Sequence, residues 1–461
     1  MSARSRGTFA TRFPGAPAGG EGTSTSDQPL ESLLADLDPS LADLARAAAD
    51  WLLPAGAWLA QLSQIELQEF LWYRLPVKWQ AEPRVLHEVA WALAGLFTAA
   101  GLERYSDLCR SPQTHLLLDA WQDKDREPAR RTMNKAVRSS GVQPPDTPLL
   151  CWGLVWGEAE HAARRRVSQA LEHAIDAGDL VAGERGWKKL AADVTENSLT
   201  MRRLDLRGGT LLQAVCRERG ESWAAGYPMV RQDLLTQILP LLDGEVAVPG
   251  GARECLKPLR WLLEHIGDGT TMTQAGWLPK TLVLEADDMF AGFGRFGLTV
   301  RTETDLPELA TLNELAQRAR LITKKGRKLW LSAAGRRALA DSSLLWRVVV
   351  ADIFSAATFE GEGSALAAAT LLRANNPVPY PAVEAKVGAG LVGRWRTASG
   401  EELEQWSGVD AAREFGLLAN LFGWIEQDGC GQDRMWTLTS SGRHAALMGL
   451  QMQARTPRRR L

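Results

Sequence analysis

Residues 306–339, LPELATLNELAQRARLITKKGRKLWLSAAGRRAL, constrain the fold of this chain more than any other stretch. Leucine and alanine recur at helical spacing as far as Ala319. Two short apolar segments, residues 321–322 and 329–331, then flank the basic loop KKGRK, and a small-residue turn opens another helix. A helix, a hairpin with a cationic tip and a second helix form the closing half of a winged helix. The stretch therefore predicts such a module.

The residues before this stretch supply the opening half of the same module. An apolar helix is predicted over residues 256–266, a short strand over residues 270–273, and a helix that begins near Pro279. Residues 306–320 then occupy the position of a recognition helix. We place a first winged-helix module at residues 250–356.

An internal repeat predicts a second module. The sequence LSAAGR at residues 331–336 corresponds to LTSSGR at residues 438–443, and a tryptophan stands in the strand before each, Trp330 and Trp436. In both copies the hydroxyl residue, Ser332 or Thr439, is expected to cap the helix that leaves the hairpin. The following glycine should let that helix pack close to the strand. We place the second winged-helix-like module at residues 363–454.

The N-terminal half predicts helices only. Apolar residues at helical spacing run through residues 30–225, with a Pro-rich sub-boundary at residues 143–148. Residues 1–29, rich in Gly, Ser, Thr, Ala and Pro, predict a disordered tail, and residues 455–461 a basic tail. The expected fold class is mainly α, with an N-terminal multi-helix domain followed by two winged-helix modules.

Positive charge is distributed unevenly between the two modules, although the whole chain has 53 Lys and Arg against 55 Asp and Glu. Residues 312–337 carry eight cations against one acid, whereas residues 415–443 carry two cations against three acids. Clustered cations are what phosphate contact requires, because counterion release drives that affinity. The candidate nucleic-acid-binding residues are Arg318, Arg320, Lys324, Lys325, Arg327, Lys328, Arg336 and Arg337. Arg318 and Arg320 would approach the groove of a DNA duplex. Lys324, Lys325, Arg327 and Lys328 would contact its phosphates. A solvated basic hairpin on a protein-binding module remains the alternative.

No other pattern indicates a catalytic, cofactor or metal site. The five cysteines are scattered and never form a CxxC pair, which argues against a zinc or disulfide framework and favours reduced thiols in the cytoplasm. Glu158 and His161 have the spacing of half a helical metal site, but no second Glu-x-x-His occurs. GFGRFG at residues 292–297 lacks the preceding strand of a dinucleotide site. The longest apolar run, residues 89–102, is too short to cross a membrane.

Residues 258–354 resemble the C-terminal part of a group of uncharacterised bacterial proteins that are common in high-GC genomes. The resemblance rests on PLRWLLEHIGDG…MTQAGWLP at residues 258–279 and on residues 306–346, with Met272 where leucine is expected. It covers about a fifth of the chain, implies a winged-helix fold and implies no established activity.

The sequence thus favours a non-enzymatic, cytoplasmic DNA-binding or DNA-associated regulator whose first module contacts double-stranded DNA. It leaves two alternatives open. One is an adaptor or scaffold that grips a protein partner through tandem winged helices, and the other is an enzyme of unknown type in the helical domain. No cofactor is expected, and a bound metal or nucleotide would favour the enzyme.

Overall fold

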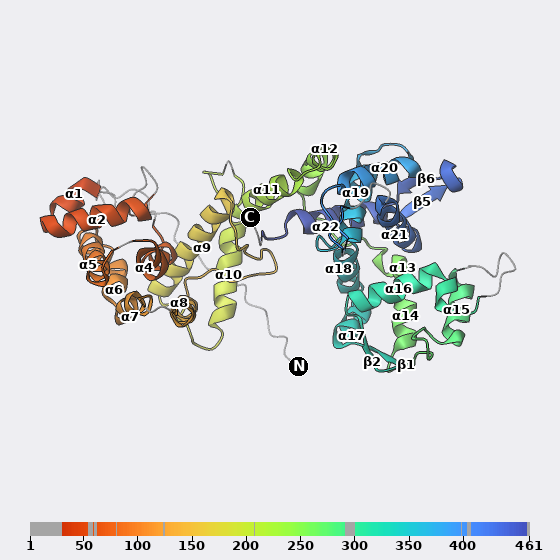
Figure 1. Ribbon diagram of the computed structural model, residues 1–461, viewed down its shortest axis with the longest axis horizontal. Helices are drawn as coiled ribbons and strands as arrows, with labels where there is room; N and C mark the ends of the chain where they lie inside the picture. Colours follow the sequence, from red (N-terminus) through yellow and green to blue (C-terminus); the bar gives the residue numbers. More distant parts are fainter. Residues whose placement is uncertain are drawn as a thin grey trace, which may run out of the picture. The chain divides into compact units, whose positions relative to one another are not determined.

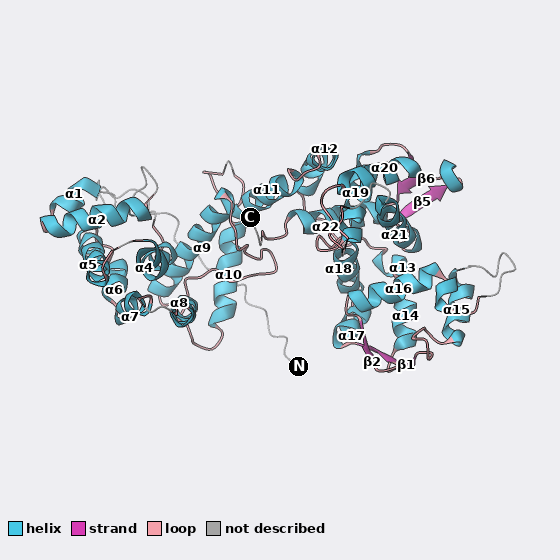
Figure 2. Ribbon diagram, viewed as in Figure 1, coloured by secondary structure: helices cyan, strands magenta, loops and turns pink. Residues whose placement is uncertain are grey.

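The chain is mainly α-helical, with two small antiparallel sheets in its C-terminal half (Figures 1 and 2). This computed structural model describes residues 30–53, 59, 62–79, 81–122, 125–206, 208–290, 300–397, 399–402 and 407–458. The tail expected at residues 1–29, the glycine-rich loop at residues 292–297, and Arg459 and Arg460 lie outside the described residues.

The chain divides into two compact units. Unit 1 comprises Met1–Cys151 with His161–Leu211, and unit 2 comprises Trp152–Glu160 with Leu212–Leu461. The helices of unit 1 are α1 Leu30–Ala35, α2 Pro39–Leu52, α3 Gln64–Glu69, a π-helical turn Phe70–Arg74, α4 Leu75–Lys78, α5 Pro83–Ala99, α6 Glu103–Arg110, α7 Pro112–Ala120, α8 Glu127–Ser139, α9 Glu158–Asp176 and α10 Trp187–Thr200. The first three residues of α9 belong to unit 2.

A buried carboxylate connects three helices of unit 1. The Oε1 atom of Glu172, on α9, accepts a hydrogen bond from the backbone N–H of Gln64 at the start of α3, at 2.8 Å. Its Oε2 atom accepts from the hydroxyl of Tyr105, on α6, at 2.8 Å. Burial raises the pKa of the Glu172 carboxyl even though these donors favour its charged form. Glu172 therefore has a structural role, because its carboxylate accepts a hydrogen bond from an N–H at the start of α3 that has no partner within the helix.

Unit 2 contains both sheets. Its elements are α11 Leu211–Ala224, α12 Met229–Ile238, a 3₁₀ turn Leu239–Leu242, α13 Ala252–Cys255, α14 Lys257–Ile266, β1 Thr270–Thr271, α15 Lys280–Phe290, a 3₁₀ turn Glu303–Asp305, α16 Pro307–Arg318, β2 Ile322–Lys325, β3 Lys328–Leu331, α17 Ala333–Ala340, α18 Ser342–Ile353, α19 Phe359–Arg373, β4 Val378–Pro379, α20 Tyr380–Leu391, α21 Ser407–Leu421, β5 Ile425–Asp428, a 3₁₀ turn Gly431–Asp433, β6 Met435–Leu438 and α22 Ser440–Ala454.

The two sheets of unit 2 have the same topology. Their strand orders are β1-β3-β2 and β4-β6-β5, so in each the last strand lies in the middle and pairs antiparallel with both neighbours. Ile322 pairs with Leu331 in the first sheet, as Ile425 pairs with Leu438 in the second. The sheets lie apart, and α18 contacts α16 and α17 beside the first sheet and α19 and α22 beside the second (Figure 1). One continuous hydrophobic core runs through both regions.

The helix that leaves each hairpin begins as the sequence predicts. The Ser332 hydroxyl accepts from the Gly335 N–H at 2.8 Å, and the Thr439 hydroxyl accepts from the Gly442 N–H at 3.0 Å. A Cβ at Gly335 would lie 2.1 Å from the Leu321 carbonyl oxygen, and one at Gly442 would lie 1.8 Å from that of Trp424. Both predictions, the hydroxyl cap and the glycine that permits close packing, are confirmed.

The end of the described chain packs within unit 2. The carbonyl of Arg455 accepts a hydrogen bond from Arg219 at 2.8 Å, and the Arg455 guanidinium reaches the carbonyl of Leu242 at 3.4 Å. Arg458 donates to the carbonyl of Glu218 at 3.1 Å, and its own carbonyl accepts from Leu154 at 2.8 Å. The segment assigned above to a basic tail is therefore held by hydrogen bonds as far as Arg458.

Candidate nucleic-acid interface

The β2–β3 hairpin presents an exposed cationic surface. Its tip carries Lys324, Lys325, Arg327 and Lys328, which we call the basic hairpin, and all four side chains are exposed. The two-residue loop consists of Gly326, with a φ of 61°, and Arg327, whose φ is not positive. This is the pattern of a type II′ turn, in which glycine supplies the first central residue.

Strand alternation places Lys325, Lys328 and Trp330 on one outer face. Lys325 pairs with Lys328 across the hairpin, and Thr323 pairs with Trp330. Residues that pair across strands share a face, and residues two apart on one strand do too. The Nζ atom of Lys328 accordingly lies 5.6 Å from the centre of the Trp330 ring. Leu329 and Leu331, which alternate with them, are buried.

Trp330 is a half-exposed aromatic side chain within this cationic surface. It is 37% exposed, and one side of its ring lies over Gly269, where a Cβ would come within 3.0 Å of the indole. Sequence reasoning named the lysines but did not place Trp330 beside them. The signal was available, since period-2 alternation with the apolar Leu329 and Leu331 puts Trp330 on the solvent side.

The hairpin is anchored to the preceding turn. The Arg327 guanidinium donates to the carbonyl of Met272 at 3.0 Å, and the Met272 N–H donates to the carbonyl of Arg327 at 2.8 Å. The Nζ atom of Lys324 lies beside Gly276 in the same turn. These contacts hold the tip on the sheet although like charges lie opposite each other, an arrangement that destabilises a strand pair.

Arg318 is engaged by carboxylates of unit 2. Its Nε lies 2.8 Å from an oxygen of Asp352 on α18, and its Nη1 lies 3.4 Å from Glu414 on α21 and 3.9 Å from Glu314. Burial disfavours the charged guanidinium, but the hydrogen bond to Asp352 and the surrounding negative charges outweigh it and raise the pKa of Arg318. Burial also raises the pKa of the Asp352 and Glu414 carboxyls, against the opposing effect of Arg318. Arg318 connects three helices and is not a free cation.

Three further candidate cations lie on the exposed surface beside the hairpin. Arg320 follows the last turn of α16 in a left-handed conformation, with a φ of 56°. Arg336 donates from Nη1 to the carbonyl of Leu331 at 2.9 Å, which leaves the remaining guanidinium donors available. Arg337 is exposed on α17. Seven of the eight candidate residues thus have solvent-exposed side chains near one sheet.

The helices before the hairpin carry acids on their accessible surfaces. Glu308 and Glu314 lie on α16, and Glu285 and Asp288 lie on α15. Carboxylates on these two helices oppose the approach of phosphates. Any contact with a polyanion through this region is therefore expected at the hairpin and not along α16.

The second sheet has the opposite electrostatic character. Glu426 and Asp428 occupy the outer face of β5, opposite Thr437 and Met435. Trp436 faces inward and is 1% exposed, 4.7 Å from the ring of Tyr380 between centroids. The corresponding surface therefore lacks both the cations and the exposed aromatic ring.

The described part of the chain contains neither a candidate metal-binding group nor a candidate membrane-spanning helix. Within it, no three His, Cys, Asp or Glu side chains come together as a metal-binding group. None of its helices is long and apolar enough to cross a bilayer.

Comparisons with protein-family models, with curated proteins and with solved structures found no significant match.

Proposed function

We propose that this protein binds double-stranded DNA through the basic hairpin, as a non-enzymatic regulator or DNA-associated protein. The two regions at residues 250–356 and 363–454 are, in this proposal, winged-helix modules. The shared element order, helix, strand, two helices and a hairpin, supports that assignment, as does the identical strand order of the two sheets.

The observation that carries the proposal is the exposed, like-charged hairpin tip. Lys325 and Lys328 lie directly opposite each other, Arg327 stands between them in the loop, and no ion pair joins any of the three to a described carboxylate. An anion that bridges these cations relieves their repulsion, and clustered cations bind phosphates through counterion release.

Binding through the hairpin predicts contact with the backbone and little sequence discrimination. Phosphate contacts position a protein on DNA, while contacts to base edges specify sequence. Glu308 and Glu314 on α16, together with the engagement of Arg318 by Asp352 and Glu414, argue against deep insertion of α16 into a major groove.

The test is duplex binding by the full-length chain across a salt series. The variant in which Lys324, Lys325, Arg327 and Lys328 are all changed to Ala is expected to lose binding at moderate salt. If all four contact phosphates, the slope of log affinity against log salt falls by about 3 to 4.

The matched control changes four other exposed cations of unit 2, Arg253, Lys257, Arg373 and Lys386, to Ala, with the same loss of net charge. It should bind duplex nearly as well as the unmodified chain. Equal weakening of both variants would mean that net charge alone attracts DNA, and no binding at low salt would overturn the proposal.

A protein-binding adaptor is the second candidate. The observation that favours it is the acidic character of α15, α16 and the outer face of β5, since these surfaces suit a basic protein better than DNA. Isolation of the full-length protein in a stoichiometric complex that the four hairpin substitutions leave intact, without duplex binding, would support this candidate instead.

A further inference from the structure

A second cationic surface lies in unit 1, between α8 and α10. A groove of about 500 Å³ is lined by Arg131, Asn134, Lys135, Arg138, Ser139, Trp187 and Lys188. Four of these seven residues are cations and none is an acid. Among the described residues, no carboxylate forms an ion pair with any of the four. We call this the α8–α10 groove.

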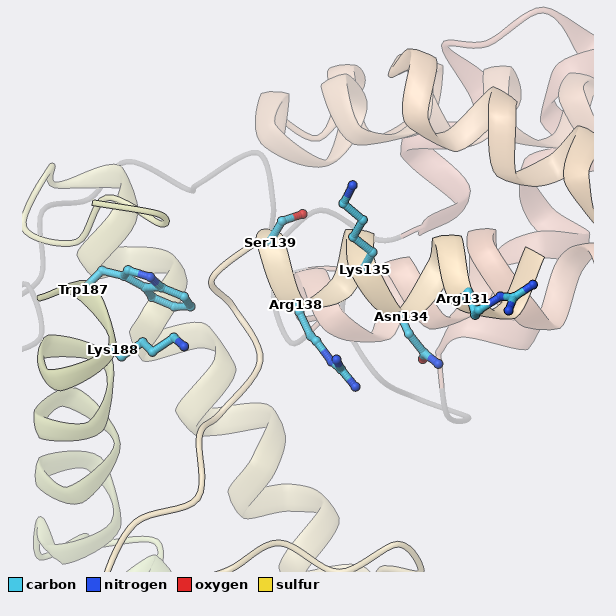
Figure 3. A pocket seen from close by; sticks show the side chains of 7 residues that line it. All are labelled: Arg131, Asn134, Lys135, Arg138, Ser139, Trp187 and Lys188. Atoms are coloured by element: carbon cyan, nitrogen blue, oxygen red, sulfur yellow. The ribbon is translucent and has the colours of Figure 1, made fainter. Parts of the chain in front are cut away.

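The cations of α8 form a row that leads to an aromatic ring. Arg131, Lys135 and Arg138 are four and three residues apart, so they share one face of the helix. At about 1.5 Å per residue the row extends about 10 Å along the helix axis. Figure 3 shows Arg138, Lys135 and Arg131 in order along α8, with the Lys135 side chain extending in the opposite direction from that of Arg138 in this view. Trp187 and Lys188 of α10 lie across from the Arg138 end.

The shape and chemistry of the groove fit an extended polyanion. A small-molecule site usually encloses its ligand and has only a few precisely placed polar groups. This groove instead has exposed cations along one wall and a half-buried indole at one end. A cationic track with an aromatic stacking surface is the arrangement that proteins use for single-stranded nucleic acid.

We propose that the α8–α10 groove binds single-stranded nucleic acid, with the phosphodiester backbone along Arg131, Lys135 and Arg138 and a base stacked on Trp187. A duplex does not fit this arrangement, because its bases are stacked on each other and cannot reach the indole. The site is separate from the basic hairpin and does not depend on the function proposed for it.

The charge pattern alone did not reveal this site. Along residues 121–139 the cations interleave with acids at residues 119–127, which is the usual pattern of a solvated helix face. What distinguishes the groove is that α10 brings Trp187 and Lys188 to the acid-free end of α8, and that proximity is a tertiary feature.

The test measures binding of the full-length chain to a labelled oligothymidylate and to a short duplex, by fluorescence anisotropy across a salt series. Changing Arg131, Lys135 and Arg138 together to Ala should weaken oligothymidylate binding at least tenfold and lower the salt slope by about 2. Trp187→Ala should weaken it roughly tenfold, and Trp187→Phe, which keeps a stacking surface, much less. The four-residue hairpin variant should retain oligothymidylate binding.

The control changes Lys78, Arg84 and Arg110 to Ala, three exposed cations of unit 1 outside the groove. It removes the same charge and should leave binding intact, and thermal unfolding verifies that every variant is folded. Equal effects of the groove and control variants would overturn the proposal. It would also be overturned by a Trp187→Ala variant with unchanged affinity, or by groove substitutions that weaken duplex binding alone.

Discussion

The two repeated regions of unit 2 share a backbone plan and differ in which face of the sheet carries the tryptophan. Leu331 and Leu438 occupy the same register, each opposite an isoleucine of the neighbouring strand. Trp330 immediately precedes Leu331, whereas Trp436 lies two residues before Leu438. Because successive side chains of a strand point to opposite faces, this offset of one residue exposes Trp330 and buries Trp436.

The same comparison extends to charge. Around the exposed tryptophan the outer face carries Lys325 and Lys328, while in the second sheet the equivalent face carries Glu426 and Asp428. The buried tryptophan packs against Tyr380 and Phe415 and fills space next to Gly416. One copy of the repeat thus uses its aromatic residue for the core, and the other leaves it available on a cationic surface.

The largest expected effect is a difference in the stability lost when each of the two tryptophans is replaced by alanine. Trp436→Ala should lower the free energy of unfolding by about 3–5 kcal/mol, because it opens a large cavity in the core. Trp330→Ala should cost no more than about 1 kcal/mol, since the indole is partly exposed and its contact with Lys328 is a surface cation–π pair. Urea unfolding of the full-length variants measures both. Similar losses would contradict the opposite placement of the two rings.

The next prediction tests the connection between the two regions. Arg318→Ala leaves Asp352 and Glu414 without their guanidinium partner and should destabilise unit 2 by about 1–3 kcal/mol at neutral pH. Burial raises the pKa of both carboxyls in the folded state, so the folded chain binds more protons than the unfolded chain just above the ordinary carboxyl range. Their contribution to stability therefore falls as pH rises through that range.

Removing Arg318 makes stability depend more strongly on pH, because the arginine opposes the rise in the pKa values of Asp352 and Glu414. The deficit of the Arg318→Ala variant should consequently shrink as pH falls and the carboxyls take up protons. Unfolding midpoints at several pH values, with Arg347→Ala as an exposed-arginine control on α18, measure this. A deficit that does not vary with pH would contradict the ion-pair role of Arg318.

The smallest expected effect concerns the turn between helix and hairpin. In both copies a left-handed residue ends the helix, Arg320 with a φ of 56° and Gly423 with a φ of 62°. The carbonyls of these residues accept from the hydroxyls of Ser332 and Thr439. Arginine is strained there and glycine is not, so Arg320→Gly should stabilise the fold by about 1 kcal/mol and Gly423→Ala should destabilise it similarly.

Strained residues of this kind are often retained for function. If Arg320 contributes to the cationic surface, Arg320→Gly should weaken duplex binding while it raises the urea midpoint. A gain in stability with no change in binding would mean that Arg320 makes no contact with the duplex.

Much of the plan of unit 2 could be predicted from local signals. The hydroxyl caps at Ser332 and Thr439 and the glycines at 335 and 442 follow from requirements of adjacent residues, and the structure has both. The charge difference between the two hairpins is equally a property of the sequence. The mainly α character follows from helical periodicity over most of the chain.

Tertiary structure decided which charged and aromatic residues are available. Arg318 has the appearance of a free cation at the end of a helix, but α18 and α21 bring Asp352 and Glu414 to it. In unit 1, α10 brings Trp187 to a row of cations about fifty residues earlier in the chain. The sequence by itself determines hairpins, caps and local charge because these depend on near neighbours. Which cations are neutralised depends on residues far along the chain, so only the folded structure decides it.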